Sequence, residues 1–162
     1  MDSLIKREIM KNITFALYNV HQHGSSFYGY LALRKQFFVD TLKWQIPHNA
    51  DVEMDQYDNP MARCSLMLDD DGRVLAGSRA MSTAATWGDH TYMLKDAMRG
   101  KLSSVPSNLL DEVIDSPKVW ECTRLVISPE VKSTRARTQC LDLIAEGLID
   151  MANAEGADTL IS

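Results

Sequence analysis

Segments of apolar and polar residues along the chain predict a mixture of strands and helices. Four β-prone apolar runs predict strands, at residues 13–19, 62–68, 73–81 and 119–127. The middle two are separated by an acidic stretch that ends in Asp71-Gly72, and an Asp–Gly step between such runs is typical of a β-hairpin. The run at 119–127 is mostly apolar, which is typical of a strand covered on both faces. Residues 159–162 predict the start of one more strand.

Helical periodicity begins near Ser25 and continues to Trp44, where Pro47 is expected to end the helix. Its apolar residues recur at spacings of three, four and seven, at Tyr28, Leu31, Phe38 and Leu42. Further along, residues 91–99 and 106–114 predict short helices or turns, with Pro106 at a helix start.

The longest helix is expected after Ser133 or Thr134, either of which is a suitable N-cap, and Gly156 is expected to stop it. One face of this helix is apolar and comprises Leu141, Ile144, Ala145, Leu148, Met151 and Ala152. The element order is therefore strand, helix, hairpin, short helices, strand, long helix and strand. That order predicts an α/β sandwich built around one mixed sheet.

A single domain is the simplest organisation, because the chain has no internal repeat and no linker rich in proline or glycine. We assign it residues 1–162. The strand expected at 159–162 has nothing after it to pair with it or cover it. We therefore expect the natural protein to continue beyond this sequence with further strands.

Composition narrows the class of protein. The 162 residues are 45% hydrophobic and 24% charged, which is ordinary for a globular protein. The net charge of -5 argues against a general nucleic-acid-binding protein. No apolar run approaches the roughly 18 residues of a membrane span, and the first residues lack a secretory signal. The widely spaced cysteines, Cys64, Cys122 and Cys140, indicate a reduced cytoplasmic protein.

Acidic residues are concentrated between positions 51 and 71, where seven acids accompany a single base, Arg63. A solvated polar loop explains this pattern, and so does a cation site built from Glu53, Asp55 and Asp58. The DxDxDG calcium signature is absent, and the four histidines lack zinc-ligand spacing. We therefore predict no metal. An organic cation fits as well, since the nearby Trp44 would add a cation–π attraction.

Glu121 and Arg124 interrupt an otherwise apolar strand. Residues three apart in a regular strand lie on opposite faces, so these two side chains cannot pair directly. Either each has another partner, or a β-bulge redirects one of them. Burial would raise the pKa of Glu121, which suits a general base. The alternative is a structural carboxylate bound to another arginine, such as Arg34 or Arg79.

Basic residues gather where the long helix is expected to begin, at Lys132, Arg135 and Arg137. A helix N-terminus attracts anions, and basic side chains strengthen that attraction. A phosphate or an acidic partner would fit there, although a solvated basic turn accounts for the same residues.

Four segments in succession resemble the acyl-homoserine-lactone synthase (autoinducer synthase) family: LRKQFFVDTLKW, EMDQYD, GSR and WECTR. The resemblance covers about residues 13–162. The positions that carry it are Arg34, Phe38, Trp44, Glu53, Asp55, Asp58, Arg79, Glu121 and Arg124. It implies a GNAT-like three-layer sandwich whose mixed central sheet splays between its fourth and fifth strands. The thioester arm of the acyl donor would enter that gap.

The resemblance also implies a reaction. An acyl group from acyl carrier protein joins S-adenosylmethionine, whose amine attacks the thioester. The methionine carboxylate then closes the lactone and expels methylthioadenosine. Both molecules would be substrates, and no permanently bound cofactor, nucleic acid or membrane is implied.

Site residues follow from the resemblance by position. Glu121 and Glu53 would be catalytic, with Glu121 taking the proton of the amine, and Arg79 and Arg124 would organise the pocket. A negatively lined pocket would bind S-adenosylmethionine through Arg34, Phe38, Trp44, Asp55 and Asp58. Acyl carrier protein would dock on Lys132, Arg135 and Arg137, because it is acidic.

Two other functions remain open. A different GNAT-like N-acyltransferase would acylate an amino acid or another small amine. A degenerate family member would bind ligand without turnover. Neither acyl-chain length nor the oxidation state at the third carbon can be predicted from this sequence.

Overall fold

The computed structural model describes residues 10–162. The described residues form five strands and three α-helices, with a 3₁₀ and a π-helical segment beside the first α-helix. In chain order they are β1 (Lys11–Ala16), η1 (Leu17–His23), α1 (Ser26–Arg34), η2 (Lys35–Thr41), β2 (Arg63–Leu68), β3 (Val74–Ser82), α2 (Met93–Met98), β4 (Val119–Ile127), α3 (Thr134–Ala154) and β5 (Thr159–Ile161).

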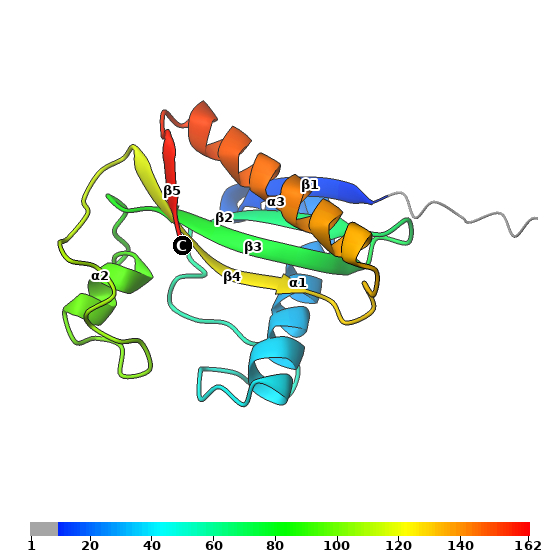
Figure 1. The fold of residues 1–162 in the computed structure, drawn as a ribbon, viewed down its shortest axis with the longest axis horizontal. Coiled ribbons are helices and arrows are strands. Elements are labelled where there is room, and N and C mark those ends of the chain that lie inside the picture. The colour runs from blue at the N-terminus through cyan, green and yellow to red at the C-terminus, as the bar shows by residue number, and fades with distance from the viewer. Residues whose placement is uncertain (1–9) are drawn as a thin grey trace, which may run out of the picture.

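The strands form one mixed sheet in the order β1-β2-β3-β4-β5. The first three pairings are antiparallel, and β4 and β5 are parallel. Helix α3 crosses one face of the sheet, and α1 with η2 lies on the other (Figure 1). The structure therefore confirms the predicted three-layer sandwich. None of the helices within residues 10–162 is both long and apolar enough to cross a membrane.

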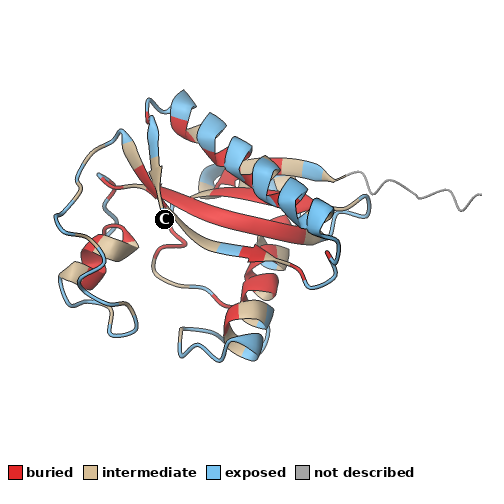
Figure 2. Ribbon diagram, in the orientation of Figure 1, coloured by how far each residue is buried: buried red, intermediate tan, exposed pale blue. Residues whose placement is uncertain are grey.

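Side chains of the central strands point alternately to the two faces of the sheet, where they form two separate apolar cores. Figure 2 shows β3 buried along most of its length. Leu66 of β2 packs in the core under α1, whereas its neighbour Met67 packs in the core under α3. Helix α1 approaches the sheet closely at Gly77, where an added Cβ would lie only 2.7 Å from the ring of Tyr30. Only glycine permits this approach without a shift of the neighbours.

Strand β4 carries a β-bulge at Arg124 and Leu125. Arg79 pairs with Thr123 and Gly77 pairs with Val126, so two residues of β4 lie opposite one residue of β3. Arg124 has a φ of 56°, and its carbonyl accepts a hydrogen bond of 2.7 Å from the Tyr30 hydroxyl. A bulge interrupts the alternation of side chains. Arg124 therefore joins Glu121 on the α1 face. A β-bulge that redirects one of these two side chains was one of the two alternatives considered from the sequence.

Strands β4 and β5 pair only over a short ladder, in agreement with the gap predicted between the fourth and fifth strands. The β4–β5 ladder covers Val119–Glu121 and Thr159–Ile161. Within residues 10–162, the remaining six residues of β4 have no partner strand on that side.

Three predictions of local structure were wrong. The first strand ends at Ala16 instead of residue 19, because a 3₁₀ segment follows it. The α-helix expected to run to Trp44 becomes a π-helix from Lys35 to Thr41. This widened turn changes the phase of the helix, and both Tyr28 and Leu42 are exposed. Pro106 does not start a helix, and residues 106–114 instead form the turns expected as the alternative, joined by irregular residues.

Candidate active site

The acidic segment at 51–58 folds against the α1 face of the sheet, where its carboxylates meet arginines from three elements. We call this set the ion network: Glu53, Asp55, Asp58, Arg34, Arg79 and Arg124. Formal charges balance within it, because three guanidinium groups meet three carboxylates. Buried charges persist only when they are paired and hydrogen-bonded in this way.

Arg34, the last residue of α1, ties two of the acids together. Its Nε donates to Glu53 Oε2 at 2.6 Å, and its two terminal nitrogens donate to the Asp58 carboxylate at 2.7 and 2.9 Å. The side chains of Arg34, Glu53 and Asp58 have no solvent-exposed surface. The bidentate bond fixes the position of the loop relative to α1.

Arg79 and Arg124 extend the network from the sheet. Arg79 of β3 donates to Asp55 at 2.6 Å and to Asp58 at 2.8 Å. Arg124, redirected by the bulge, donates to Asp55 at 2.8 Å and to Glu53 at 3.3 Å. The pairing of Glu121 with Arg34 or Arg79, considered from the sequence, does not occur; these arginines bind the acidic loop instead.

The electrostatics follow from this pairing. Burial alone would raise the pKa of Asp58, but Arg79 and Arg34 outweigh it and hold that pKa well below its usual range. Burial also opposes the charge on Arg79, yet Asp55 and Asp58 raise its pKa above the usual arginine value. The solvated loop considered from the sequence is therefore excluded. The expectation of a negatively lined pocket is wrong as well, since each acid has an arginine partner.

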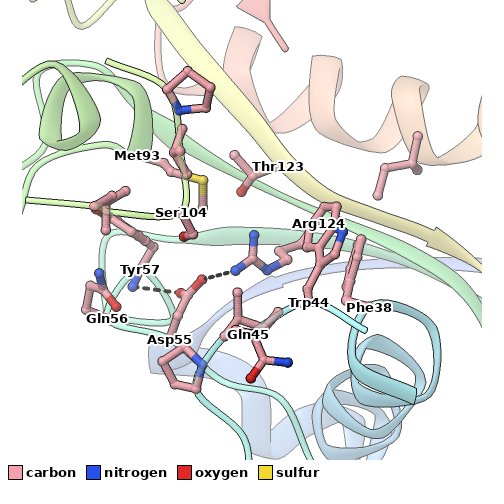
Figure 3. Close-up of a pocket in the computed structure, with 16 residues that line it drawn as sticks. Phe38, Trp44, Gln45, Asp55, Gln56, Tyr57, Met93, Ser104, Thr123 and Arg124 are labelled. Atoms are coloured by element: carbon pink, nitrogen blue, oxygen red, sulfur yellow. Dashed lines mark hydrogen bonds and ion pairs between the residues drawn. The ribbon is translucent and has the colours of Figure 1, made fainter. Parts of the chain in front are cut away.

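A cavity of about 580 Å³ opens beside the network (Figure 3). Asp55 and Arg124 supply the charges in its lining, and Phe38, Trp44 and Tyr57 supply the aromatic surface. The rings of Phe38 and Trp44 stack at 4.8 Å with an interplanar angle of 25°. Trp44 is nearly half-exposed, so its ring is available to a ligand. Arg34, Glu53 and Asp58 lie behind the cavity and are not part of its lining.

Glu121 is buried on the same sheet face, behind the cavity residue Met93. Its two oxygens accept hydrogen bonds from the backbone N–H groups of Met93 and Leu94 at 2.9 and 2.8 Å. These are the first residues of α2, so Glu121 of strand β4 caps the N-terminus of that helix. Burial nevertheless raises the pKa of Glu121, because the amide bonds only partly offset the loss of solvent.

Several residues that line the cavity were not predicted from the sequence. Tyr57 lies inside the acidic motif and was not singled out, although its aromatic character was visible there. Met93 and Thr123 also line the cavity, and Arg79 Nε donates to the Thr123 hydroxyl at 3.2 Å. Nothing in local sequence signals Met93, because its position depends on how α2 packs.

A second cavity of about 400 Å³ lies on the α3 face, beside the stretch of β4 that has no partner strand. Leu141, Ile144, Ala145 and Leu148 of α3 line it, which accounts for the exposure of Leu141 and Ala145 on the predicted apolar face. Its lining also includes Thr123, Arg124 and Leu125. The bulge of β4 is therefore shared by both cavities.

The basic residues Lys132, Arg135 and Arg137 are all exposed at the start of α3. Arg137 donates to the carbonyl of Val131 at 3.2 Å. Within residues 10–162, no three His, Cys, Asp or Glu side chains are arranged to hold a metal ion.

Comparisons with known proteins bear on the family and the fold. An acyl-homoserine-lactone synthase of Rhizobium etli is 28% identical over 132 residues, or 79% of this chain. The chain spans 56% of that relative's length. The crystal structure of the AHL synthase LasI matches with a TM-score of 0.70 and 21% identity, covering 94% of this chain and 71% of LasI.

An acyl-CoA N-acyltransferase from Pseudomonas aeruginosa shares the fold at a TM-score of 0.52 and 15% identity, covering 88% of this chain and 73% of that structure. This match supports the GNAT-like architecture. The sequence pattern of the autoinducer synthase family matches residues 19–162 of this chain. The chain therefore belongs to the autoinducer synthase family.

Proposed function

We propose that the protein is an acyl-homoserine-lactone synthase, which transfers an acyl group from a thioester to S-adenosylmethionine and releases methylthioadenosine. One observation carries the proposal: a cavity with aromatic faces and one ion pair, Asp55–Arg124, lies beside the buried Glu121. Membership of the autoinducer synthase family supports it.

The charge distribution of the cavity suits the amino-acid end of S-adenosylmethionine. Asp55 would accept hydrogen bonds from the ammonium group, and Arg124 would donate to the carboxylate. The sulfonium would lie against Trp44, whose stacking on Phe38 fixes its face. A charge-balanced site recognises a zwitterion because each charged group of the site lies next to a ligand group of opposite charge. Arg34, Asp58 and Arg79 hold this arrangement from behind the cavity.

Glu121 would receive a proton from the ammonium group, directly or through a water, and so free the nitrogen lone pair. That nitrogen attacks the thioester carbon, and the tetrahedral adduct collapses to the amide by expelling the thiolate, which takes up the second amine proton. The methionine carboxylate oxygen then attacks the γ-carbon, and the C–S bond breaks to release neutral methylthioadenosine. Glu53 contacts Arg124 rather than the cavity, so its predicted catalytic role would act through that arginine.

The bulge of β4 would stabilise the tetrahedral oxyanion. The extra residue of a bulge is left out of the ladder, which frees a backbone N–H for a ligand. Arg124 and Leu125 form this bulge and contact both cavities. A thioester entering from the α3 face would thus reach the amine from the opposite side of β4.

The acyl donor would be acyl carrier protein, with Lys132, Arg135 and Arg137 as docking contacts for its acidic surface. The related structures BjaI and MesI are described as CoA-dependent synthases. Comparing rates with acyl carrier protein and acyl-CoA carrying the same acyl group decides between the donors. Reversing all three charges should slow the carrier-protein reaction far more than the CoA reaction. We retain the cytoplasm as the predicted location.

A second candidate function is N-acylation of an amino acid. The balanced Asp55–Arg124 pair favours it too, because any zwitterion fits that pair. Mass spectrometry of the products discriminates the two. We expect equal amounts of an N-acyl-homoserine lactone and methylthioadenosine. An N-acyl amino acid without methylthioadenosine would support the second candidate, and ligand binding without either product would indicate a degenerate member.

A further inference from the structure

Tyr57 connects the cavity to a buried acid that the proposed reaction does not use. Its ring lines the cavity, and its hydroxyl donates to Asp96 Oδ2 at 2.8 Å. Asp96 belongs to α2 and has no exposed surface. The cavity wall formed by Tyr57 is thus attached to a helix 39 residues further along the chain.

Asp96 is held from several sides. Thr91 donates from its backbone N–H at 3.1 Å and from its hydroxyl at 2.8 Å, and His90 Nδ1 lies 3.3 Å away. Burial alone would raise the pKa of Asp96, but these bonds and the one from Tyr57 lower it. A charged carboxylate in such a site is a strong and rigid acceptor for the phenol.

At its other end, Tyr57 contacts the residues that set the charge of the cavity. Its backbone N–H donates to Asp55 Oδ1 at 2.9 Å, as Figure 3 shows. The guanidinium of Arg79, which also binds Asp55, lies 5.7 Å from the centre of the Tyr57 ring. A movement of the Tyr57 ring would therefore change the aromatic wall and the ring's contact with Arg79, which in turn binds the Asp55 carboxylate.

We propose that Asp96 is a positioning residue for substrate binding, which acts through the Tyr57 hydroxyl to hold the Asp55 side of the cavity in place. This inference rests on the proposed function, because the ligand concerned is S-adenosylmethionine. Neither residue belongs to the nine positions on which the family resemblance was recognised. Asp96 touches neither cavity, so it contributes by fixing Tyr57 and not by contacting the ligand.

The protein offers a matched control in Tyr92. This tyrosine is buried in the same apolar cluster, and its hydroxyl donates to the carbonyl of Ile114 at 2.6 Å. Tyr92 does not line the cavity. Tyr92→Phe therefore removes a donated buried phenolic hydrogen bond, just as Tyr57→Phe does, without altering the cavity wall. It also removes the bond that the Tyr92 hydroxyl accepts from the Ile114 N–H at 3.1 Å. The two variants should lose similar amounts of thermal stability.

The test measures the Kd of S-adenosylmethionine by calorimetry for the wild type, Tyr57→Phe, Asp96→Asn, their double variant and Tyr92→Phe. We expect Tyr57→Phe and Asp96→Asn each to raise the Kd roughly tenfold, about the loss of one hydrogen bond to a charged group. The double variant should match the single ones, because both remove the same link. The Kd of Tyr92→Phe should stay within about twofold of the wild type.

Turnover supplies a second readout, since kcat at saturating S-adenosylmethionine should change much less than KM in Tyr57→Phe. Equal Kd values for Tyr57→Phe and Tyr92→Phe, or additive effects in the double variant, would overturn the role of Asp96 while leaving the proposed function intact. A wild-type protein that fails to bind S-adenosylmethionine would overturn both.

Discussion

Two acidic segments of this chain have similar composition, but one is buried among arginines and the other is exposed. Residues 51–58 contain four acids, of which Glu53, Asp55 and Asp58 are held by three arginines under the sheet. Residues 69–71 contain three acids and form the exposed turn of the β2–β3 hairpin. There Asp69 binds Arg73 in a local turn, and Asp70 and Asp71 face solvent.

The difference shows that acidic density along a chain does not define a cation site. Residues 51–58 differ from the hairpin turn because arginines from three elements contact them. These are Arg34 from α1, Arg79 from β3 and Arg124 from the bulge in β4. These partners cancel the charge of the loop and leave Asp55 beside Arg124 at the cavity.

Replacing Arg34 with methionine should have the largest effect on stability. The change leaves Glu53 and Asp58 short of a buried partner, and breaking such a pair costs about 3–5 kcal/mol of unfolding free energy. The neighbouring variant Lys35→Met serves as the control, since it removes only the partly exposed ion pair with Asp40 and should cost less than about 1 kcal/mol. Urea unfolding measures both. Similar losses in the two variants would contradict a buried network.

The pH dependence of the same variant provides a further check. Because the pKa of Asp58 is depressed, its contribution to stability is present above the ordinary value of 3.8 and is lost as the pH falls towards the folded-state pKa. Arg34→Met weakens that depression. Its stability should therefore fall less steeply than that of the wild type when the pH is lowered below about 4.

Glu121→Gln should have the largest effect on turnover. Loss of a general base lowers kcat by about 10²- to 10⁴-fold, while the Kd of S-adenosylmethionine should change little. Since burial raises the pKa of Glu121, the wild-type rate should fall on the acid side at a pH above the ordinary glutamate value of 4.5. That acid limb should vanish in the variant. If it persists and only thermal stability falls, Glu121 merely caps α2.

Trp44→Ala should have an intermediate effect, confined to binding. The cation–π attraction of an aromatic face is about 0.5–2 kcal/mol, so the Kd of S-adenosylmethionine should rise about three- to thirtyfold. Trp87 is an exposed tryptophan outside the cavity, which makes Trp87→Ala the control. Calorimetry should show no change in the control. Equal affinities of both variants would remove Trp44 from the binding site.

The smallest effect is expected in the hairpin turn. Asp70→Asn combined with Asp71→Asn removes two exposed charges and should change the unfolding free energy by less than about 0.5 kcal/mol. Substrate affinity should also remain unchanged. A clear loss in either measurement would show that acidic residues act through the net charge of this face rather than through specific partners.

Much of the fold could be predicted from the sequence, because strands and the long α3 helix carry strong periodicity. The spacing of Glu121 and Arg124 even led to a β-bulge as one alternative. The π-helical turn of η2 could not be predicted, since Tyr28 and Leu42 continued an ordinary helical pattern that the structure abandons.

Within the site, motif positions indicated the right residues but not how they divide their roles. Asp58 and Asp55 look alike in sequence, yet only Asp55 reaches the cavity, because Asp58 is held in the interior by the fully buried Arg34. Glu121 accepts hydrogen bonds from the backbone of α2, and Asp96 accepts one from Tyr57, which lies 39 residues away in the sequence. Such contacts depend on packing between distant segments and leave no local pattern.

The most direct test of the account is the affinity of S-adenosylmethionine for Asp55→Asn, compared with Asp70→Asn in the hairpin turn. Circular dichroism establishes that both variants are folded, and calorimetry then measures the Kd. Since Asp55 is the acid that faces the cavity, its loss should weaken binding about tenfold or more, as expected for a hydrogen bond to a charged group. Asp70→Asn should bind like the wild type. Unchanged affinity in folded Asp55→Asn, or an equal loss in Asp70→Asn, would contradict the assignment of this cavity to the substrate.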